Sequence, residues 1–373
     1  MMKKFAGSLL VGCMVFLLME LNLFACGFEE YREINYNKEM IQAMNAVFNA
    51  RNKIGLEKGD EKLLALTNAG YGTINGKTTE AFLDIVSNVT ACTMGTKSLL
   101  TVHTPFAEPL WCALYRKDNG KLIFIKWSEK GFTQQQIDIS QEKIFKSQDW
   151  KKAASGIIGS KTLFSVVTIS HCWAADVSWS LLKTAEFHNH ICPGLNTGFI
   201  IGEYLQKKYP LRKGEKYMFI GAPPGCLLDA LQIIFDTTAG KSAAFSKAVS
   251  KQKIEKYSQD LWFKDAPISP LAVIVMRVNK KSNSCEGVVL GVDWKSIFAD
   301  AGRNYQDFAP PGGKANPVYF ISRAKLSVKM ASISMAKKLT YVKEIKKFFG
   351  QAALAQKLAM EGTDPYAVIQ SLQ

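Results

Sequence analysis

Apolar and polar residues follow one another along this chain in patterns that predict both helices and strands. Apolar side chains at helical spacing, among them Met40, Met44 and Val47, predict a helix over residues 30–55. A short apolar run then ends in a glycine-containing bend near Gly70, which is typical of a strand that enters a loop. These patterns therefore predict a mixed α+β fold.

Further elements follow from apolar runs and turn residues. Residues 110–127 predict a hairpin around Asp118-Asn119-Gly120, and residues 271–294 predict a second hairpin. A strand-like run at 216–221 leads through Pro223-Pro224-Gly225 into a predicted helix that begins at Cys226. We also expect a strand at Phe164–Ile169.

The same order of strand, helix, polar loop and hairpin occurs twice. Three pairs of identical residues lie 145 positions apart: Asp84 and Asp229, Thr93 and Thr238, Gly95 and Gly240. Three more lie 161 positions apart: Pro109 and Pro270, Leu110 and Leu271, Arg116 and Arg277. We therefore predict two related α/β repeats, residues 30–150 and 151–300, that form a pseudo-dimer. The alternative is that two α+β units merely share turn chemistry.

A tail follows the second repeat. Residues 301–373 are predicted to be largely helical, with apolar residues such as Phe348, Phe349 and Leu354 beside lysines. Such a tail packs on its own domain or on a twin subunit more often than it acts alone.

The N-terminus is typical of an export signal over residues 1–25. Lys3-Lys4 precede an apolar run from Phe5 to Met19, which is too short to span a bilayer. Leu23-Phe24-Ala25-Cys26 fits two schemes: cleavage after Ala25, or a lipobox in which Cys26 is lipidated. We expect a periplasmic protein or a membrane-anchored lipoprotein.

Composition narrows the function classes. Hydrophobic residues make up 47% of the chain, which favours a packed body, and the net charge is +15. The lysines are dispersed and no nucleic-acid-binding motif accompanies them, so we expect no nucleic-acid partner. A lipid anchor would instead place the basic protein at a membrane surface. The sequence also lacks a dinucleotide-binding fingerprint, a Walker-type phosphate loop and a serine-hydrolase elbow.

Metal chemistry is indicated by one short segment. His188, His190 and Cys192 alternate, so on an extended backbone they would point to the same side. Imidazole and thiolate are ligands that zinc and its transition-metal neighbours prefer. Pro193 suits the first position of a helix, which would make Cys192 the N-cap and favour its thiolate.

The remaining ligands must come from elsewhere in the chain. Cys226 is the best candidate for a fourth ligand, and Asp229, three residues later, could accept a hydrogen bond from a ligand. Cys92 and His103 could approach from the first repeat, although a core cysteine and a loop histidine are the commoner roles. A disulfide between Cys192 and Cys226, or ordinary packing, remains the alternative to a metal site.

The motifs resemble those of the FmdE family, which takes its name from a component of formylmethanofuran dehydrogenase. Phe187–Gly194 is similar to its Phe-His-Gly-His-X-Cys-Pro-Gly motif, with Asn189 in place of glycine. Cys226–Gln232 matches a second motif, while a third has lost its cysteine at 236–241 but survives at 91–95. The resemblance implies an α+β fold that binds zinc or a similar divalent metal and often forms a homodimer. The ligands it implies are His188 or His190, Cys192 and Cys226.

The sequence thus predicts an exported protein that binds a metal ion, zinc before others, and handles metal or a small ligand. The alternative is a metal-dependent enzyme with an open zinc position and an unknown small-molecule substrate. A third hypothesis is an envelope protein whose cysteines form disulfides. Whether the protein is an enzyme is left open by these residues.

Overall fold

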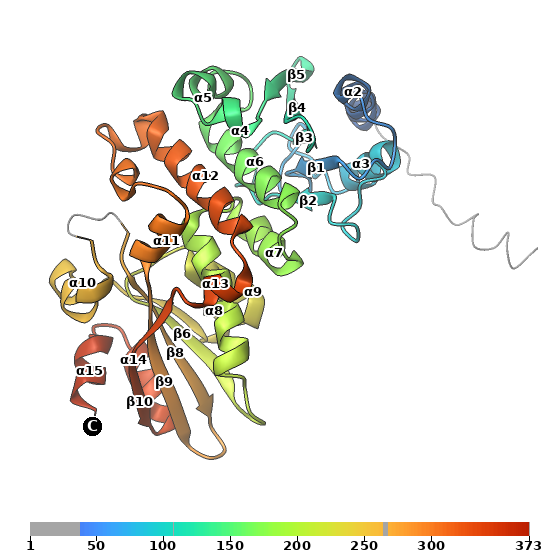
Figure 1. Cartoon of the computed structure of the whole chain (residues 1–373). Coiled ribbons are helices and arrows are strands. Elements are labelled where there is room, and N and C mark those ends of the chain that lie inside the picture. The colour runs from blue at the N-terminus through green and yellow to red at the C-terminus, as the bar shows by residue number, and fades with distance from the viewer. Residues whose placement is uncertain (1–37, 107, 264–267, 373) are drawn as a thin grey trace, which may run out of the picture. The chain divides into compact units, whose positions relative to one another are not determined.

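The computed structural model describes residues 38–106, 108–263 and 268–372 (Figure 1). The chain divides into two compact units, Met1–Gln42 and Ala43–Gln373. Of the elements, only the first residues of helix α2 (Lys38–Ile54) belong to the first unit. The signal-peptide prediction and Cys26 lie outside the described residues.

The first half of the second unit is built on a five-stranded sheet in the order β2-β1-β3-β4-β5. Strand β1 pairs in parallel with β2 and antiparallel with β3, and the remaining strands form an antiparallel meander. Both predicted hairpin strands are present here. The elements of this half are β1 (Leu63–Thr67), α3 (Phe82–Thr90), β2 (Leu99–Thr101), β3 (Trp111–Arg116), β4 (Lys121–Ser128), β5 (Gly131–Asp138), α4 (Gln141–Ile144) and α5 (Ser147–Ala154).

Three helices lead from the first sheet to the second: α6 (Gly159–Ala174), α7 (Trp179–His188) and α8 (Pro193–Lys208). The second sheet has the order β7-β6-β8-β9-β10. Its elements are β6 (Lys216–Gly221), α9 (Leu227–Phe235), η1 (Ala239–Lys241), β7 (Ala244–Ser246), α10 (Lys251–Tyr257), η2 (Gln259–Leu261), β8 (Leu271–Asn279), β9 (Ser284–Val292) and β10 (Val342–Gly350).

The chain between β9 and β10 and the segment after β10 are mostly helical. They contain α11 (Trp294–Asp300), η3 (Tyr305–Phe308), η4 (Gly313–Ala315), α12 (Pro317–Ser332), α13 (Met335–Leu339), α14 (Ala352–Ala359) and α15 (Pro365–Ser371). Side chains or prolines define several helix starts: Asn316 accepts a bond from the Val318 N–H ahead of Pro317, for example. The predicted α+β class is confirmed.

The two sheets share their strand order and their register. Each starts with a parallel pair, β1–β2 or β6–β7, and continues through three antiparallel neighbours. Leu63 pairs with Arg116 in the first sheet, and Tyr217 pairs with Arg277 in the second. The helix after the first strand ends in a left-handed residue in both halves, Ala91 and Asp236, at φ 59° and 55°. A common origin of the halves remains a prediction.

Helices α8 and α12 contribute to two cores at once. Leu195 and Phe199 of α8, and Ala324 of α12, pack in the core that covers the first sheet and α6. Leu205 of α8 and Met330 of α12 pack in the core on one face of the second sheet. The other face of that sheet is covered by α10, α14 and α15. Helices α8 and α12 are therefore packed on both sides, which positions the start of α8 relative to both sheets.

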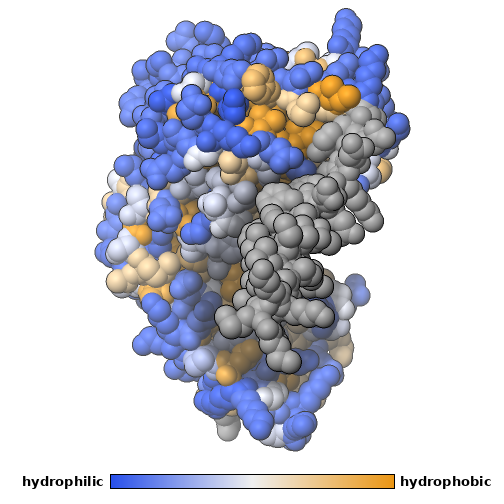
Figure 2. All heavy atoms as spheres, turned by 90° about the vertical axis from the view of Figure 1, so that its right-hand side faces the viewer, coloured by the Kyte–Doolittle hydropathy of each residue, from blue (hydrophilic) through white to orange (hydrophobic). Residues whose placement is uncertain are grey.

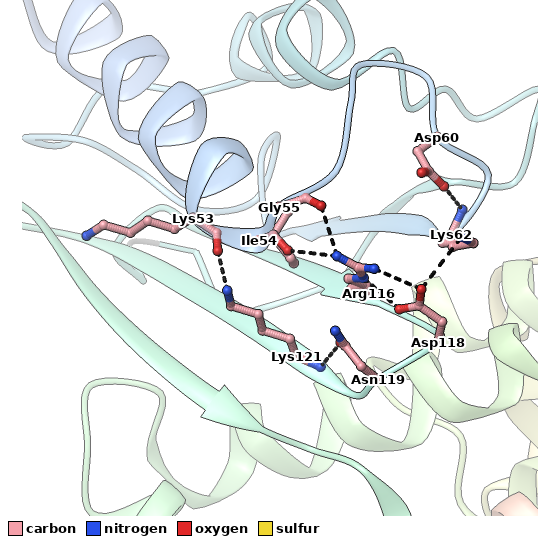
Figure 3. A network of polar contacts seen from close by, with 9 residues as sticks. All are labelled: Lys53, Ile54, Gly55, Asp60, Lys62, Arg116, Asp118, Asn119 and Lys121. Atoms are coloured by element: carbon pink, nitrogen blue, oxygen red, sulfur yellow. Dashed lines mark hydrogen bonds and ion pairs between the residues drawn. The ribbon is translucent and has the colours of Figure 1, made fainter.

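Polar contacts join the end of α2 to the first hairpin (Figure 3). Arg116 donates to the carbonyl oxygen of Gly55 at 2.9 Å and forms an ion pair with Asp118. Lys121 donates to the carbonyl oxygen of Lys53. Since the last carbonyls of a helix have no intrahelical partner, these cations satisfy them and hold the helix end against the hairpin.

One local prediction was wrong, and another was correct only in part. Residues 164–169 lie in helix α6 rather than in a strand, because the whole stretch from 163 to 172 is buried between neighbouring elements. Residues 342–350 form β10, so the tail is only partly helical. Burial alternates along this segment as it does on a strand, because Phe348 is buried while the adjacent Phe349 is 64% exposed. The Phe348 ring covers Gly287, its partner on β9.

The surface agrees with the lysine-rich composition. Figure 2 shows a face on which hydrophilic residues predominate, with apolar residues gathered in small groups. Within the described ranges no single helix is long and apolar enough to cross a membrane. Helices α5 and α6 meet that criterion only as a pair, across a bend of 119°.

Candidate metal centre

The N-terminus of α8 places the first candidate ligand. Cys192 is the N-cap, and its sulfur accepts a hydrogen bond from the Leu195 N–H at 3.3 Å. Pro193 occupies the first helical turn, as predicted. The thiol is buried, and it faces the positive end of a 16-residue helix. A helix N-terminus stabilises a thiolate, so Cys192 is chemically suited to hold a cation.

The C-terminus of α7 carries the second candidate ligand. His188 is the last residue of that helix, and Asn189 ends it in the left-handed conformation with φ 61°. Asparagine is one of the few non-glycine residues that adopt this conformation readily, which explains why it can stand where the FmdE motif has glycine. The expected extended backbone is therefore absent. His188 and Cys192 meet because the chain turns between two helices.

The third candidate lies at the start of α9. Cys226 is the N-cap of this helix, which follows β6 and the Pro-Pro-Gly turn. It occupies the helix start that the sequence predicted. Its side chain makes no capping hydrogen bond and is only partly buried, so its sulfur remains available to a ligand.

Three glycines bring the starts of α8 and α9 together. Gly194, Gly198 and Gly202 recur every four residues and so lie on one face of α8. A Cβ at Gly198 would lie 2.4 Å from the carbonyl oxygen of Leu227, and one at Gly202 would lie 3.0 Å from Ile234. At Gly194 it would lie 3.1 Å from Cys226 itself. Only glycine permits this close approach. The recurrence of glycine every four residues in α8 could have indicated the helix contact from the sequence, but our prediction did not use it.

His188, Cys192 and Cys226 form the set of metal-ligating residues that the described part of the chain brings together. Their nitrogen and sulfur atoms all lie within 4.8 Å of one another. The Nε2 of His188 is 3.7 Å from the sulfur of Cys192. In a tetrahedral zinc site, bonds of about 2.05 Å to nitrogen and about 2.3 Å to sulfur would separate these atoms by about 3.6 Å. The residues therefore fit a zinc-like ion.

Asp229 orients the histidine. The Nδ1 of His188 lies 2.7 Å from a carboxylate oxygen of Asp229, one turn along α9 from Cys226. Since this bond occupies Nδ1, it leaves Nε2 to face the two sulfurs. Carboxylate–histidine pairs of this kind fix the tautomer and raise the basicity of metal-binding imidazoles. The structure thus places Asp229 where the sequence expected a supporting acceptor.

The three candidate ligands also perturb one another's protonation. Burial on its own would lower the pKa of His188, but hydrogen bonds with Asp229 and Cys226 raise it to about 9. A hydrogen bond from Cys192, opposed by burial and supported by His188, lowers the pKa of Cys226 to about 5. The same hydrogen bond and burial raise the pKa of Cys192 well above its usual value. Such groups exchange protons for a metal ion readily.

His190 lies beside this set without joining it. Its ring is 4.4 Å from that of His188 between centroids and packs on Phe164 at 5.0 Å. The Nδ1 of His190 lies 2.6 Å from the side-chain oxygen of Asn189. Burial, followed by the charge of His188, lowers the pKa of His190 to about 3. A neutral imidazole at this place faces the cavity described below.

The first half contributes one of its two predicted residues to the surroundings. The N–H of His103 donates to the carbonyl oxygen of Glu186 at 3.1 Å, and the residue lines the same cavity as His190. The sulfur of Cys92 is buried 3.7 Å from the carbonyl oxygen of Leu63, and the structure does not bring it to the other three. All six cysteines in the described residues are free: Cys92, Cys112, Cys172, Cys192, Cys226 and Cys285.

A cavity of about 690 Å³ opens beside the sulfurs. Cys192 and Cys226 form part of its wall, together with the glycine-rich starts of α8 and α9. The rest of the wall comes from strands β3, β4 and β8, from helices α6, α11 and α12, from η3 and η4, and from the loops that contain His103, His190 and Ser269. Sequence reasoning missed the contribution of α12 because nothing in the tail's composition indicates which helix it contacts. With three protein ligands, a bound ion would have a coordination position left for a molecule in this cavity.

Comparison with known families agrees with this geometry. Residues 187–268 match the family FmdE, described as "FmdE, Molybdenum formylmethanofuran dehydrogenase operon". This segment is similar to the FmdE domain. The match includes His188, Cys192, Cys226 and Asp229, so every residue of the candidate centre lies in the matched segment. A comparison with curated proteins found no match.

Proposed function

We propose that this protein is exported and binds one divalent transition-metal ion, zinc before others, through His188, Cys192 and Cys226. The observation that carries the proposal is the convergence of one imidazole and two sulfurs within 4.8 Å. These residues come from the ends of three separate helices. Their convergence on a single point, with Asp229 bonded to the imidazole, is what a metal site requires and a packed core does not.

The role we propose for the bound ion is to hold a small molecule that enters the cavity. Zinc acts as a Lewis acid at an open coordination position, and it can also acidify a bound water. Gly194 keeps the space beside the sulfurs clear, because a Cβ there would lie 3.6 Å from the sulfur of Cys226. Asp229 would hold His188 in the tautomer that presents Nε2.

Metal analysis of the purified protein tests the proposal. We expect about one equivalent of zinc or another divalent ion, and loss of that metal in Cys192→Ser. Cys285→Ser is the matched control, because Cys285 is equally buried but lies on β9 outside the cavity. Absence of metal from protein whose thiols are free would contradict the proposal. Metal-free protein without a titratable Cys192 or Cys226 thiol would instead favour the disulfide alternative.

A metal-dependent enzyme is the second candidate function. The open position and the cavity favour it, since catalytic zinc sites keep a fourth position for water or substrate. Spectroscopy of the cobalt-substituted protein separates the two. An exchangeable water on the metal favours catalysis, whereas four protein ligands, with His190 or another residue completing the set, favour a structural or storage site.

A further inference from the structure

The cavity beside the candidate metal centre has a charge pattern that the metal ligands do not explain. Its lining contains four cationic side chains from four elements or loops: Lys126, Lys161, Lys314 and Arg323. The carboxylate of Glu108 is the single acid among the lining residues. None of the four cations forms an ion pair with another residue that the structure describes. Uncompensated positive charge in a concave site attracts anions.

Arg323 is the most informative of these residues. Its guanidinium donates to the carbonyl oxygens of Tyr319 and Phe308, at 3.0 Å and 2.9 Å. It also lies 3.5 Å from the ring centroid of Tyr319. Burial lowers the pKa of Arg323, while Tyr319 and Cys192 act in the opposite direction. The side chain is thus partly buried near the sulfur site, held by neutral groups alone.

Another buried arginine in this protein has its charge balanced by acidic side chains. Arg277, buried on β8, forms ion pairs with Glu286 and Glu215. Removing a charge from water costs several kcal/mol unless an opposite charge accompanies it. Arg277 has that partner within the chain and Arg323 does not, among the described residues. A guanidinium presents a planar fork that suits carboxylate and phosphate oxygens.

The cavity also has apolar walls. Phe164 of α6 and Phe320 of α12 pack on each other at 5.5 Å between ring centroids, and both line the cavity. Trp111, Trp294 and Phe308 line it as well. A volume of about 690 Å³ falls within the range of about 300–1,000 Å³ that is usual for small-molecule sites. Aromatic walls favour a flat apolar body over a bare inorganic ion.

We propose that the cavity binds a small organic anion with an apolar or aromatic body, whose carboxylate or phosphate-like group lies at Arg323. Lys126, Lys161 and Lys314 attract the anion, and Phe164 and Phe320 contact its body. The inference rests on the proposed function, because the metal ligands Cys192 and Cys226 form part of the same cavity wall. It goes beyond that function in naming the chemical class of the ligand and the residue that selects it.

Calorimetric titration of the zinc-loaded protein with four probes tests this inference. Benzoate and phenylphosphonate carry both an anion and a ring, benzamide carries only the ring, and acetate only the anion. We expect at least one aromatic anion to bind ten times more tightly than benzamide and acetate. The stronger of the two identifies the anionic group. Equal binding of benzamide would overturn the inference.

Variants locate the anion. Arg323→Gln retains donors for the two carbonyls but removes the charge, and we expect it to weaken binding of the aromatic anion at least tenfold. Arg212→Gln is the control, since Arg212 is exposed and outside the cavity. If Arg323→Gln does not fold, the variant Lys161→Gln, at an exposed residue, tests the inference instead. We expect it to weaken binding of the aromatic anion about threefold, and this difference should disappear at high salt. Unchanged binding in both variants would contradict the inference.

Zinc content, measured on the same samples, separates the two proposals. A protein that holds zinc but discriminates no anion would refute the inference and leave the proposed function intact. A protein that holds neither zinc nor another divalent transition-metal ion would refute the proposed function whatever the probes do.

Discussion

The two halves of this protein present the same sheet, but one of them contains a candidate metal centre and the other does not. Helix α3 of the first half and α9 of the second lie 145 positions apart at both ends. Where α9 begins with Cys226, α3 begins with Ala81. The helix start is therefore present in both halves, and the sulfur in one.

The helix before the first strand differs in the same way. Helices α2 and α8 each precede the first strand of their sheet, and 154 positions separate Gly198 from Met44 and Gly202 from Phe48. Gly198 lets α8 approach the backbone of α9, whereas Met44 and Phe48 are bulky and 37% and 48% exposed. The comparison teaches that the shared sheet and helices do not make a metal site by themselves. The candidate site also needs two cysteines and a histidine as ligands, and three glycines that let α8 approach α9.

The largest effect should follow from removing the residue that distinguishes the two helix starts. We expect Cys226→Ala, which gives α9 the residue that α3 has, to abolish stoichiometric metal binding, because two ligands remain where three or four are needed. Metal analysis after dialysis is the measurement. The reciprocal Ala81→Cys should add no second equivalent, since no histidine accompanies it. Binding of a second equivalent of metal would show that a cysteine at this helix start is sufficient without the histidine.

The paired aspartates provide the next test. Asp229→Asn should weaken metal binding about 10- to 100-fold, because the charged acceptor that orients His188 is lost. Competition with a chromophoric chelator measures the affinity. Asp84→Asn, the exposed counterpart 145 positions earlier, serves as the control and should change nothing. Equal effects of both substitutions would mean that Asp229 acts through helix stability.

The glycine face can be tested by adding one methyl group. Gly198→Ala should destabilise the fold by about 1–3 kcal/mol, because its Cβ would meet the carbonyl oxygen of Leu227 at 2.4 Å. It should also lower metal affinity by moving Cys192 away from Cys226. Chemical denaturation and the chelator assay report the two effects. Gly240→Ala, where a Cβ meets nothing within 4 Å, is the neutral control.

The protons on the candidate ligands provide a further test, because metal affinity should depend on pH. In the metal-free protein His188 has a pKa of about 9 and Cys192 one raised well above its usual value, whereas Cys226, at about 5, is already a thiolate near neutrality. Metal binding must displace the protons of His188 and Cys192, so affinity should rise with pH. Two protons should be released per ion between pH 5 and 9, and one above pH 9. Calorimetry in buffers of different ionisation enthalpy counts them; pH-independent affinity would exclude these ligands.

Local signals were sufficient for part of the site. Pro193 after Cys192 predicted a helix start with the cysteine as its cap, and the helix α8 begins there. Cys226 and Asp229 were expected on one helix because three residues correspond to one turn. The alternation of His188, His190 and Cys192 was misleading, since it assumed a strand. Asn189 ends a helix there, so the three side chains do not share a side.

The tail shows the limit of pattern reasoning most clearly. Its apolar residues beside lysines fitted a helix, but residues 342–350 form a strand that pairs with β9 and completes the second sheet. Gly287 on β9 leaves a gap that Phe348 fills, and nothing local to Phe348 indicates a partner about 60 residues earlier. Strand pairing depends on distant residues, so periodicity within one segment cannot establish it.

The sequence by itself determined which residues could bind a metal, where the helices that carry the cysteines begin, and the mixed α+β class, because capping, turn chemistry and apolar spacing act over a few residues. Only the tertiary structure decided that His188, Cys192 and Cys226 meet while His190 and Cys92 do not join them, and that α12 brings Arg323 to the same cavity. Those outcomes depend on how closely α8 can approach α9 and on how two cores hold α8 and α12 between them. They are set by packing between segments far apart in the chain, which no local pattern records.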